Sequence, residues 1–323
     1  MSAGLVHALL LDGHGGATFL DDAADALNRA SSDSNLLWLH FDYTDPSAQH
    51  WLTEHSGLGP VSVDALLAPE TRPRVTPMHD GLLIYLRGVN HDPTADPEDM
   101  IAIRMVVQKH RIISTQKRGL LSVQEMLAQL RQREGVRSAS ELVADLVDRL
   151  TWYMDDVVER IDADLDALED QPLTNIQLQR RQIADTRRRI TVLRRYLAPQ
   201  REVLARLHAE PSGVLAESER MVVREAADRM QRLLEDLDMF RDHATLAQEA
   251  LDSQMSDQLS RRMYALAVIS GMFLPLTFLT GLFGVNLAGI PGAEHPLGFA
   301  GFAGALVFLL LVSGAFLYAR KWF

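Results

Sequence analysis

The amino-acid sequence predicts an α/β domain followed by long stalk helices and a C-terminal hairpin of two transmembrane helices. Short apolar runs between turn-rich segments fill the first third of the 323 residues, and almost unbroken helical periodicity follows. The segment between Arg262 and Arg320 contains one carboxylate and no basic residue apart from one histidine. About 260 residues precede this segment, enough for one or two domains with a hydrophobic core.

Residues 1–118 have the pattern of an α/β domain with a mixed sheet. We expect strands at Val6–Leu11, Leu36–Phe41, Leu82–Val89, Ile101–Gln108 and Arg111–Gln116, with helices near Ser47–His55 and Ser62–Leu67. The glycine-rich segment 13–16 lacks both the Gly-Lys-Ser/Thr ending and the GxGxxG spacing of nucleotide-binding loops. We therefore interpret it as a turn and expect no nucleotide site.

Residues 119–214 are predicted to be helical and to contain an antiparallel αα-hairpin. Glu141–Asp170 ends in a strongly acidic stretch, whereas Ile176–His208 is rich in arginine. Pro172 and the capping residues Thr174 and Asn175 separate the two helices, so opposite charges should face each other along the hairpin. The carboxylates could instead bind Ca²⁺ or Mg²⁺, but they spread around the helix and form no loop of ligands.

Residues 215–283 are predicted to form one helix that continues from the stalk into the membrane. This segment has no glycine before Gly271 and no proline before Pro275. Its roughly 69 residues would extend on the order of 100 Å at ~1.5 Å per residue. Such a helix needs neighbours that bury its apolar side.

Two apolar runs, Met263–Phe283 and Leu297–Tyr318, each match the ~20 residues that span a bilayer. We assign the second helix to residues 297–319, the outer loop to residues 284–296 and a basic tail to residues 320–323. Basic residues flank the two predicted transmembrane helices at Arg261, Arg262, Arg320 and Lys321, and the outer loop has no lysine or arginine. The positive-inside rule therefore predicts an inner (plasma) membrane protein with both termini in the cytoplasm.

The composition excludes several kinds of site. Cysteine is absent, so disulfides and thiolate metal sites are excluded. A formal charge of −11 argues against nucleic-acid binding. The run Leu5–Leu11 is interrupted by His7 and lacks a basic flank, so we expect no signal peptide.

One side of the first span carries mostly small or hydroxylated side chains. Alternating steps of three and four residues give this stripe, which we call the pore stripe: Ser256, Ser260, Met263, Ala267, Ser270, Leu274, Thr277 and Gly281. Either close helix packing or the wall of a water-filled pathway would explain it. Two spans cannot enclose a pathway, so conduction would require several copies around one axis.

The segment from Met263 to Asn286 resembles the first span and signature of the CorA family of divalent-cation transporters. In that family a Gly-Met-Asn triplet ends the pore helix, whereas this chain has Gly284-Val285-Asn286. The variant triplet resembles the zinc-transporter (ZntB) branch, as do the segments 70–75 (ETRPRV), 194–201 (RRYLAPQR) and 321–323 (KWF). The resemblance covers nearly the whole chain.

The resemblance implies a funnel-shaped homopentamer that transports divalent cations, with Zn²⁺ as the substrate. Five first spans would line the pore, and Gly284, Val285 and Asn286 would form its entrance and selectivity site. Five amide oxygens of Asn286 would face the hydration shell of a cation. Such neutral oxygens suit hard ions at least as well as Zn²⁺, so zinc is inferred from the resemblance alone.

Further residues are candidates for gating or metal capture. Met263, Leu266 and Leu274 could form apolar constrictions that gate by dewetting, although packing residues would look the same. Cations could be concentrated at the outer mouth by Glu294 and His295, and at the inner mouth by Glu249, Asp252 and Asp257. We interpret His243 as an ordinary stalk residue.

The expected function is Zn²⁺ transport through this pore, with uptake as the direction and protons as a potential second substrate. Alternatives are a CorA-like Mg²⁺ or Co²⁺ channel, zinc efflux through the same pore, and a membrane-anchored sensor that conducts nothing. No nucleophile–base pair or metal-hydrolase pattern occurs, so we expect neither an enzyme nor a bound cofactor. The expected partners are Zn²⁺, the lipid bilayer and further copies of the chain.

Overall fold

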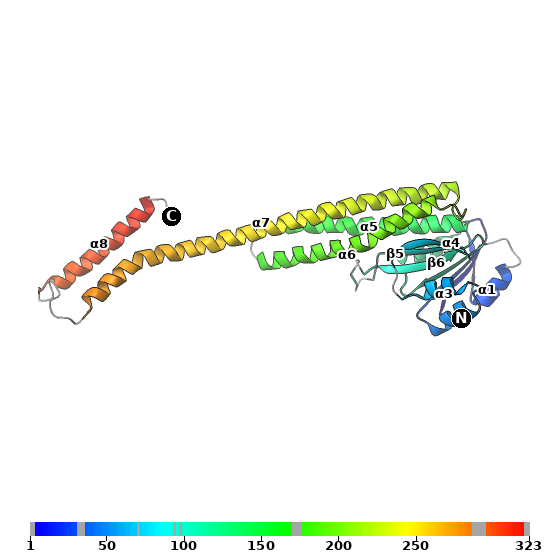
Figure 1. Cartoon of the computed structure of the whole chain (residues 1–323), viewed down its shortest axis with the longest axis horizontal. Coiled ribbons are helices and arrows are strands. Elements are labelled where there is room, and N and C mark those ends of the chain that lie inside the picture. The colour runs from blue at the N-terminus through cyan, green and yellow to red at the C-terminus, as the bar shows by residue number, and fades with distance from the viewer. Residues whose placement is uncertain are drawn as a thin grey trace. The chain divides into compact units, whose positions relative to one another are not determined.

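A computed structural model describes residues 4–30, 36–69, 72–79, 81–92, 95–96, 99–169, 176–285 and 295–319 (Figure 1). The chain divides into two compact units, Met1–Gln248 and Glu249–Phe323. We describe each unit separately.

The first unit contains a seven-stranded sheet. Its strands are β1 (Leu5–Leu11), β2 (Ala17–Leu20), β3 (Leu37–Asp42), β4 (Arg74–Met78), β5 (Gly81–Gly88), β6 (Ile101–Val107) and β7 (Arg111–Gln116), in the order β2-β1-β3-β7-β6-β5-β4. Only the β3–β7 pair is parallel among the described strand pairs. The predicted mixed sheet is therefore confirmed.

Three short helices cover one face of the sheet: α1 (Ala23–Ala30), α2 (Pro46–Glu54) and α3 (Pro60–Leu67). Alternate strand residues such as Leu39, Leu83 and Ile113 pack with Leu52 of α2 and Leu66 of α3 in one apolar core. This alternation follows from the two-residue period of a strand. Both α2 and α3 begin with proline, whose fixed φ and missing N–H suit the first helical turn.

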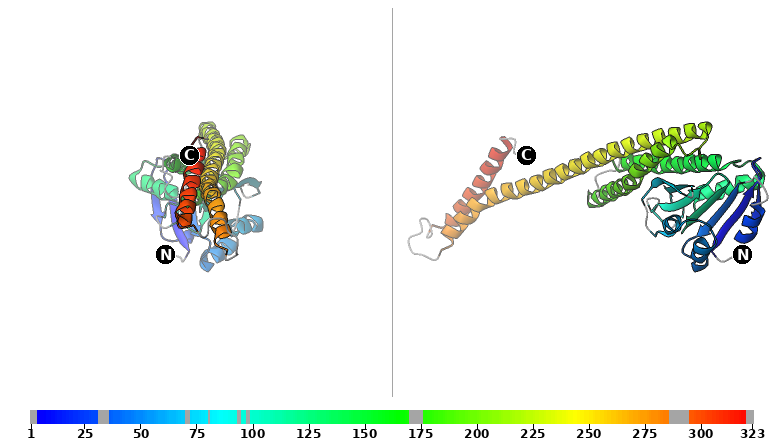
Figure 2. Two further views of the ribbon diagram at one scale, coloured as in Figure 1. Left: turned by 90° about the vertical axis from the view of Figure 1, so that its left-hand side faces the viewer. Right: turned by 45° about the vertical axis from the view of Figure 1, so that its right-hand side comes forward.

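The opposite face is covered by helices from the following region, α4 (Leu121–Gln132), α5 (Ala139–Glu169) and α6 (Ile176–Ala209) (Figure 2). At Gly88 the packing is so close that a Cβ atom would lie 2.5 Å from Leu150 and 2.7 Å from Leu120. Gln200 of α6 accepts a bond from the Arg87 backbone N–H at 2.8 Å and donates to its carbonyl at 3.0 Å. This pair of bonds joins α6 to β5.

Three elements were not anticipated by the sequence analysis. The strands β2 and β4 form the two edges of the sheet, and β4 contains Pro77, which cannot donate a ladder hydrogen bond. The helix α1 has only eight residues. The predicted turn is confirmed: Asp12 Oδ1 accepts from the N–H groups of His14 at 2.7 Å and Gly16 at 2.9 Å.

The helices α5, α6 and α7 (Glu217–Phe283) are joined by ion pairs in the first unit. Arg189 of α6 contacts Asp164 of α5 at 2.7 Å, which is the predicted pairing of acidic and basic arms. Arg194 of α6 also pairs with Asp238 of α7. The connection at residues 170–175, with its predicted proline break and cap, lies outside the described residues.

The helix α7 is 67 residues long and passes through Pro275 without ending. It starts two residues after the expected Leu215 and ends at the expected Phe283. A last helix, α8, covers Gly298–Ala319. Among the described residues, α7 and α8 are the two helices long and apolar enough to cross a membrane, which fits the predicted two-helix anchor.

Candidate cation pathway

Within the second unit, α8 lies antiparallel to the end of α7. The rings of Phe283 and Phe302 have centroids 5.0 Å apart. Farther along, a cavity of about 410 Å³ is lined by Ala267, Val268, Gly271 and Met272 of α7 and by Val312, Ser313 and Phe316 of α8. One side of α7 is therefore covered by α8, and Val268 on that side is only 5% exposed.

The pore stripe lies on the other side of α7. Ser270, Leu274 and Thr277 each precede a buried or half-buried residue by two positions, namely Met272, Leu276 and Leu279. Two positions correspond to about 200° around an α-helix. The stripe is thus directed away from α8, and Met263 and Leu274 are 63% and 72% exposed in a single chain.

All eight predicted stripe residues are on α7 and are exposed. Ala267 sits at the edge of the stripe, since it also lines the cavity with α8. The gate candidate Leu274 lies about 20° from Met263 around the helix, but Leu266 lies about 60° from it. Met263 and Leu274 therefore lie on one line along α7, and Leu266 lies beside that line.

Hydroxyl groups on α7 bond to the backbone of their own helix. Thr277 Oγ1 donates to the Phe273 carbonyl at 2.9 Å, and Thr280 Oγ1 donates to the Thr277 carbonyl at 3.0 Å. This satisfies their protons and leaves oxygen lone pairs on the helix surface, where a hydrated cation can approach them. Pro275 has no N–H, so the Gly271 carbonyl loses its usual helical donor.

The signature triplet begins where α7 ends. The Gly284 N–H donates to the Thr280 carbonyl at 2.9 Å, and a Cβ on Gly284 would lie 2.8 Å from that oxygen. Glycine therefore fits the tight end of the helix. Val285 is exposed, whereas the predicted entrance residue Asn286 lies outside the described residues.

The predicted outer capture pair is described only in part. Glu294 lies outside the described residues. The His295 ring is exposed, and its Nδ1 accepts from the Leu297 N–H at 3.2 Å in the turn before α8. Because Nδ1 accepts, the neutral ring carries its proton on Nε2, so in this orientation Nε2 can donate a hydrogen bond and the ring must turn before it can bind a metal.

Of the three inner capture candidates, Glu249 and Asp252 lie within about 40° of Met263 around α7 and continue the line of the pore stripe. Glu249 and Asp257 are exposed and Asp252 is half-buried. Asp257 lies about 120° around the helix from Met263, so it does not continue the pore stripe. Within the described part of the chain, no three histidine or carboxylate side chains are grouped so that they could hold a metal ion. His243, interpreted as a stalk residue, is half-buried on α7.

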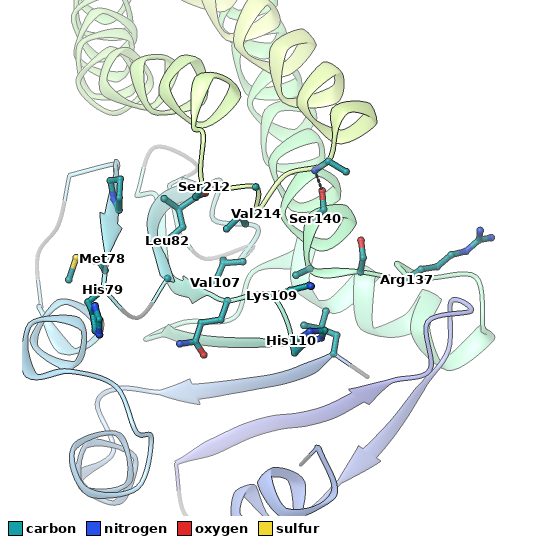
Figure 3. Close-up of a pocket in the computed structure, with 18 residues that line it drawn as sticks. Met78, His79, Leu82, Val107, Lys109, His110, Arg137, Ser140, Ser212 and Val214 are labelled. Carbon is teal, nitrogen blue, oxygen red and sulfur yellow. Dashed lines mark hydrogen bonds between the residues drawn. The ribbon is translucent and has the colours of Figure 1, made fainter. Parts of the chain in front are cut away.

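A separate cavity of about 730 Å³ lies in the first unit, between the strand hairpins, the start of α5 and the segment before α7 (Figure 3). Lys109 and His110 line it, but Arg137 points away from it in Figure 3. Ser140 Oγ accepts from the Ala216 N–H at 2.8 Å, so this hydroxyl holds the start of α7. The cavity has no part in the pore stripe.

The chain is similar to known transporters over nearly its whole length. The family described as "CorA-like Mg2+ transporter protein" matches residues 33–321. The zinc transport protein ZntB of Pectobacterium carotovorum subsp. carotovorum is 36% identical over 323 residues, covering 99% of this chain and 96% of that protein. The divalent cation transporter CmaX of Pseudomonas aeruginosa is 37% identical over 299 residues, covering 92% and 90%.

Solved structures show the same fold. Full-length CmaX has a TM-score of 0.81 at 34% identity and covers 97% of this chain and 98% of its own. The CorA magnesium transporter of Methanocaldococcus jannaschii has a TM-score of 0.85 at 16% identity, covering 98% and 99%. These relatives are transporters and not enzymes. Because the family match and the relatives span nearly the whole sequence, this chain belongs to the CorA family of divalent-cation transporters, in the branch that includes ZntB.

Proposed function

We propose that this protein carries Zn²⁺ into the cytoplasm across the inner (plasma) membrane, through a homopentameric pore lined by α7. The observation that carries the proposal is the pore stripe. Its small and hydroxylated side chains are exposed on the side of α7 that faces away from α8. A helix surface of this kind suits the wall of a water-filled path.

Assembly follows from the surface that a single chain leaves uncovered. Besides the stripe, α7 exposes large apolar residues such as Ile269, Phe273 and Phe278. Lipid or neighbouring helices can cover these residues, but the stripe needs partners that present the same surface. A closed ring of identical copies meets this need, with α7 inside and α8 outside. The number five is taken from the family resemblance.

The proposed entrance uses amide oxygens in place of charges. Gly284 ends α7 so tightly that a side chain would meet the preceding turn, and the Asn286 side chain would follow at the mouth. A ring of neutral oxygens holds a hydrated divalent ion weakly, so that the ion can also leave. Zinc as the cargo rests on the names of the relatives, because this ligand set does not itself select a soft ion.

The membrane potential favours uptake. A divalent ion gains roughly 4.6 kcal/mol per 100 mV on entering a negative-inside cell, twice the ~2.3 kcal/mol of a single charge. The span Met263–Phe283 contains no carboxylate, lysine or histidine that could relay protons. Any proton coupling must therefore use water, hydroxyl groups or groups at the mouths, such as the imidazole of His295.

The test is uptake of ⁶⁵Zn²⁺ into liposomes that contain the purified protein. We expect uptake that persists in excess Mg²⁺, rises with an inward proton gradient and is abolished by Asn286→Ala. A matched control, Asn28→Ala at an exposed position of α1, should transport normally. Normal uptake by Asn286→Ala would contradict the proposed entrance.

A second candidate is a Mg²⁺ or Co²⁺ channel, which the neutral oxygen ligands favour. The same liposomes separate the two candidates. Uptake of ⁶⁵Zn²⁺ that Mg²⁺ blocks and that a proton gradient does not change would assign the protein to this second function. Absence of any divalent flux from an assembled ring would contradict both.

A further inference from the structure

The outer side of α6 carries a row of arginines. Arg181, Arg188 and Arg195 are seven residues apart, so they lie along one line of the helix. We call this set the arginine ridge. All three are exposed, and Ile190 on the opposite side of α6 is completely buried. The ridge is thus directed away from the core of its own chain.

Among the described residues, the ridge forms no ion pair within its own chain. Arg181 and Arg188 form no ion pair with any residue in the described ranges, and Arg195 donates to the Tyr196 hydroxyl at 2.7 Å. Other arginines hold α6 in place, since Arg189 pairs with α5 and Arg194 pairs with α7. Structural ion pairing and the ridge therefore involve different sides of α6.

A carboxylate cluster lies where α5 meets α7. Arg229 of α7 pairs with Asp148 of α5 at 3.0 Å, and seven residues further along each helix Asp155 and Asp236 come to the same level. With Glu235 on α7 and Asp162, the next residue of this line on α5, they form the carboxylate cluster. Partial burial raises the pKa of Asp236, and repulsion from Asp155, Glu235 and Asp162 raises it further, while Arg232 opposes this. The carboxylates of the cluster thus repel one another within one chain.

The cluster and the ridge lie on different sides of the three helices. Asp164 of α5 contacts Arg189 of α6 at 2.7 Å. Asp162 precedes Asp164 by two positions, which places it about 160° away around α5. Asp162 therefore faces away from α6, and the ridge of one chain cannot reach the cluster of the same chain.

We propose that the arginine ridge of each copy docks on the carboxylate cluster of the next copy in the ring. This inference rests on the ring assembly of the proposed function. A contact between two different surfaces of the same chain closes into a ring when every copy repeats it. The occupant of the cluster is thus a second copy of this chain.

The spacing of the two surfaces matches. Arg188 and Arg195 are seven residues apart on α6, and Asp162 and Asp155 are seven residues apart on α5, about 10.5 Å in each case. The helices are antiparallel, so Arg188 would meet Asp162 and Arg195 would meet Asp155. Measured along the helices from the level of the Arg189–Asp164 contact, both pairs need the same axial offset, about 4.5 Å.

Such pairs set register more than affinity. Exposed arginine–carboxylate contacts are individually weak and are screened by salt. Repeated around a ring, they suppress wrong pairings because a shifted register would bring like charges together. The docking therefore orients the cytoplasmic units relative to each other.

The experiment uses the absence of cysteine from the chain. In membranes, the double variant Asp162→Cys/Arg188→Cys is treated with a short bis-thiosulfonate reagent, which spans more than a direct disulfide. We expect a ladder of crosslinked species up to the complete ring, and no ladder from either single variant. The control Asp164→Cys/Arg189→Cys, whose positions meet within one chain, should crosslink internally without a ladder.

A charge exchange provides the second measurement. Arg188→Asp brings like charges together at every contact of the ring, so it should lower the fraction of ring seen by native mass spectrometry several-fold at low salt. Arg188→Asp/Asp162→Arg should restore that fraction. Chelation of divalent cations should change neither the ladder nor the ring fraction.

Three outcomes would overturn the docking. One is an assembled, transporting ring that gives no ladder. Another is a failure of Arg188→Asp/Asp162→Arg to restore the fraction of ring. The last is a ladder that requires divalent cations, which would make the cluster a cation site. A purified protein that stays monomeric would instead contradict the proposed function.

Discussion

The buried histidine His40 provides a quantitative test of the first unit. Its side chain is fully buried in β3, and its Nδ1 lies 2.7 Å from Ser114 Oγ, which also accepts from Trp38 Nε1 at 2.8 Å. The ring of His7 stacks on it with centroids 6.1 Å apart. Burial lowers the pKa of His40 from 6.5 to about 4; bonding to Gln116 opposes this, and His7 adds to it.

The sign and size of the effect follow from proton linkage. Between pH 6.5 and about 4 the unfolded chain binds a proton that the folded chain does not. The contribution to the free energy of unfolding is therefore complete above pH 6.5 and is lost as the pH falls towards 4. At 1.36 kcal/mol per pH unit the loss is roughly 3 kcal/mol, as an upper limit.

The assay measures the free energy of unfolding of the full-length protein in detergent. Urea unfolding is monitored by tryptophan fluorescence at several pH values from 7 to 4. His40→Gln should lose roughly 3 kcal/mol less than the wild type over this range. His14→Gln, at an exposed position, should behave as the wild type. Equal pH dependence of His40→Gln and the wild type would refute the assignment of this effect to burial of His40.

Two further substitutions test the end of α7 at Gly284 and the contact between α6 and β5. Gly284→Ala places a methyl group 2.8 Å from the Thr280 carbonyl oxygen and should lower Zn²⁺ uptake at least several-fold. The control Gly314→Ala, whose methyl group would have no atom within 4 Å, should not lower it. Equal uptake by the two variants would contradict the tight helix end. Gln200→Leu removes the side-chain partner of the half-buried N–H and C=O of Arg87 and should lower the free energy of unfolding by about 2 kcal/mol. The control Glu202→Leu, at an exposed position, should change it little.

Much of the fold was predictable because its elements have strong local signals. Five strands with continuous apolar runs were expected, and the helix through Pro275 was expected from the lack of earlier breakers. The edge strands β2 and β4 were not predicted because their half-exposed residues form no apolar run. The parallel pairing of β3 with β7 joins segments far apart in sequence, so no local pattern shows it.

The candidate site was predictable as a pattern but not as an arrangement. Spacing alone gives the pore stripe, whereas the contact of α8 with Val268 and Met272 shows which side of α7 remains available. Charge counting predicts an acidic and a basic helix. Which arginines pair within the chain depends on the packing of α5, α6 and α7, so the unused ridge containing Arg188 is visible only in the structure.

The most direct test of the central claim labels single cysteines on α7 during Zn²⁺ uptake. Thr277→Cys lies on the pore stripe, and Leu279→Cys, two positions away, faces α8; no other cysteine is present. A water-soluble, cationic thiol reagent should block ⁶⁵Zn²⁺ uptake through Thr277→Cys and leave Leu279→Cys unaffected. Block of Leu279→Cys alone, or unchanged uptake in a fully labelled Thr277→Cys protein, would contradict a pore lined by this stripe.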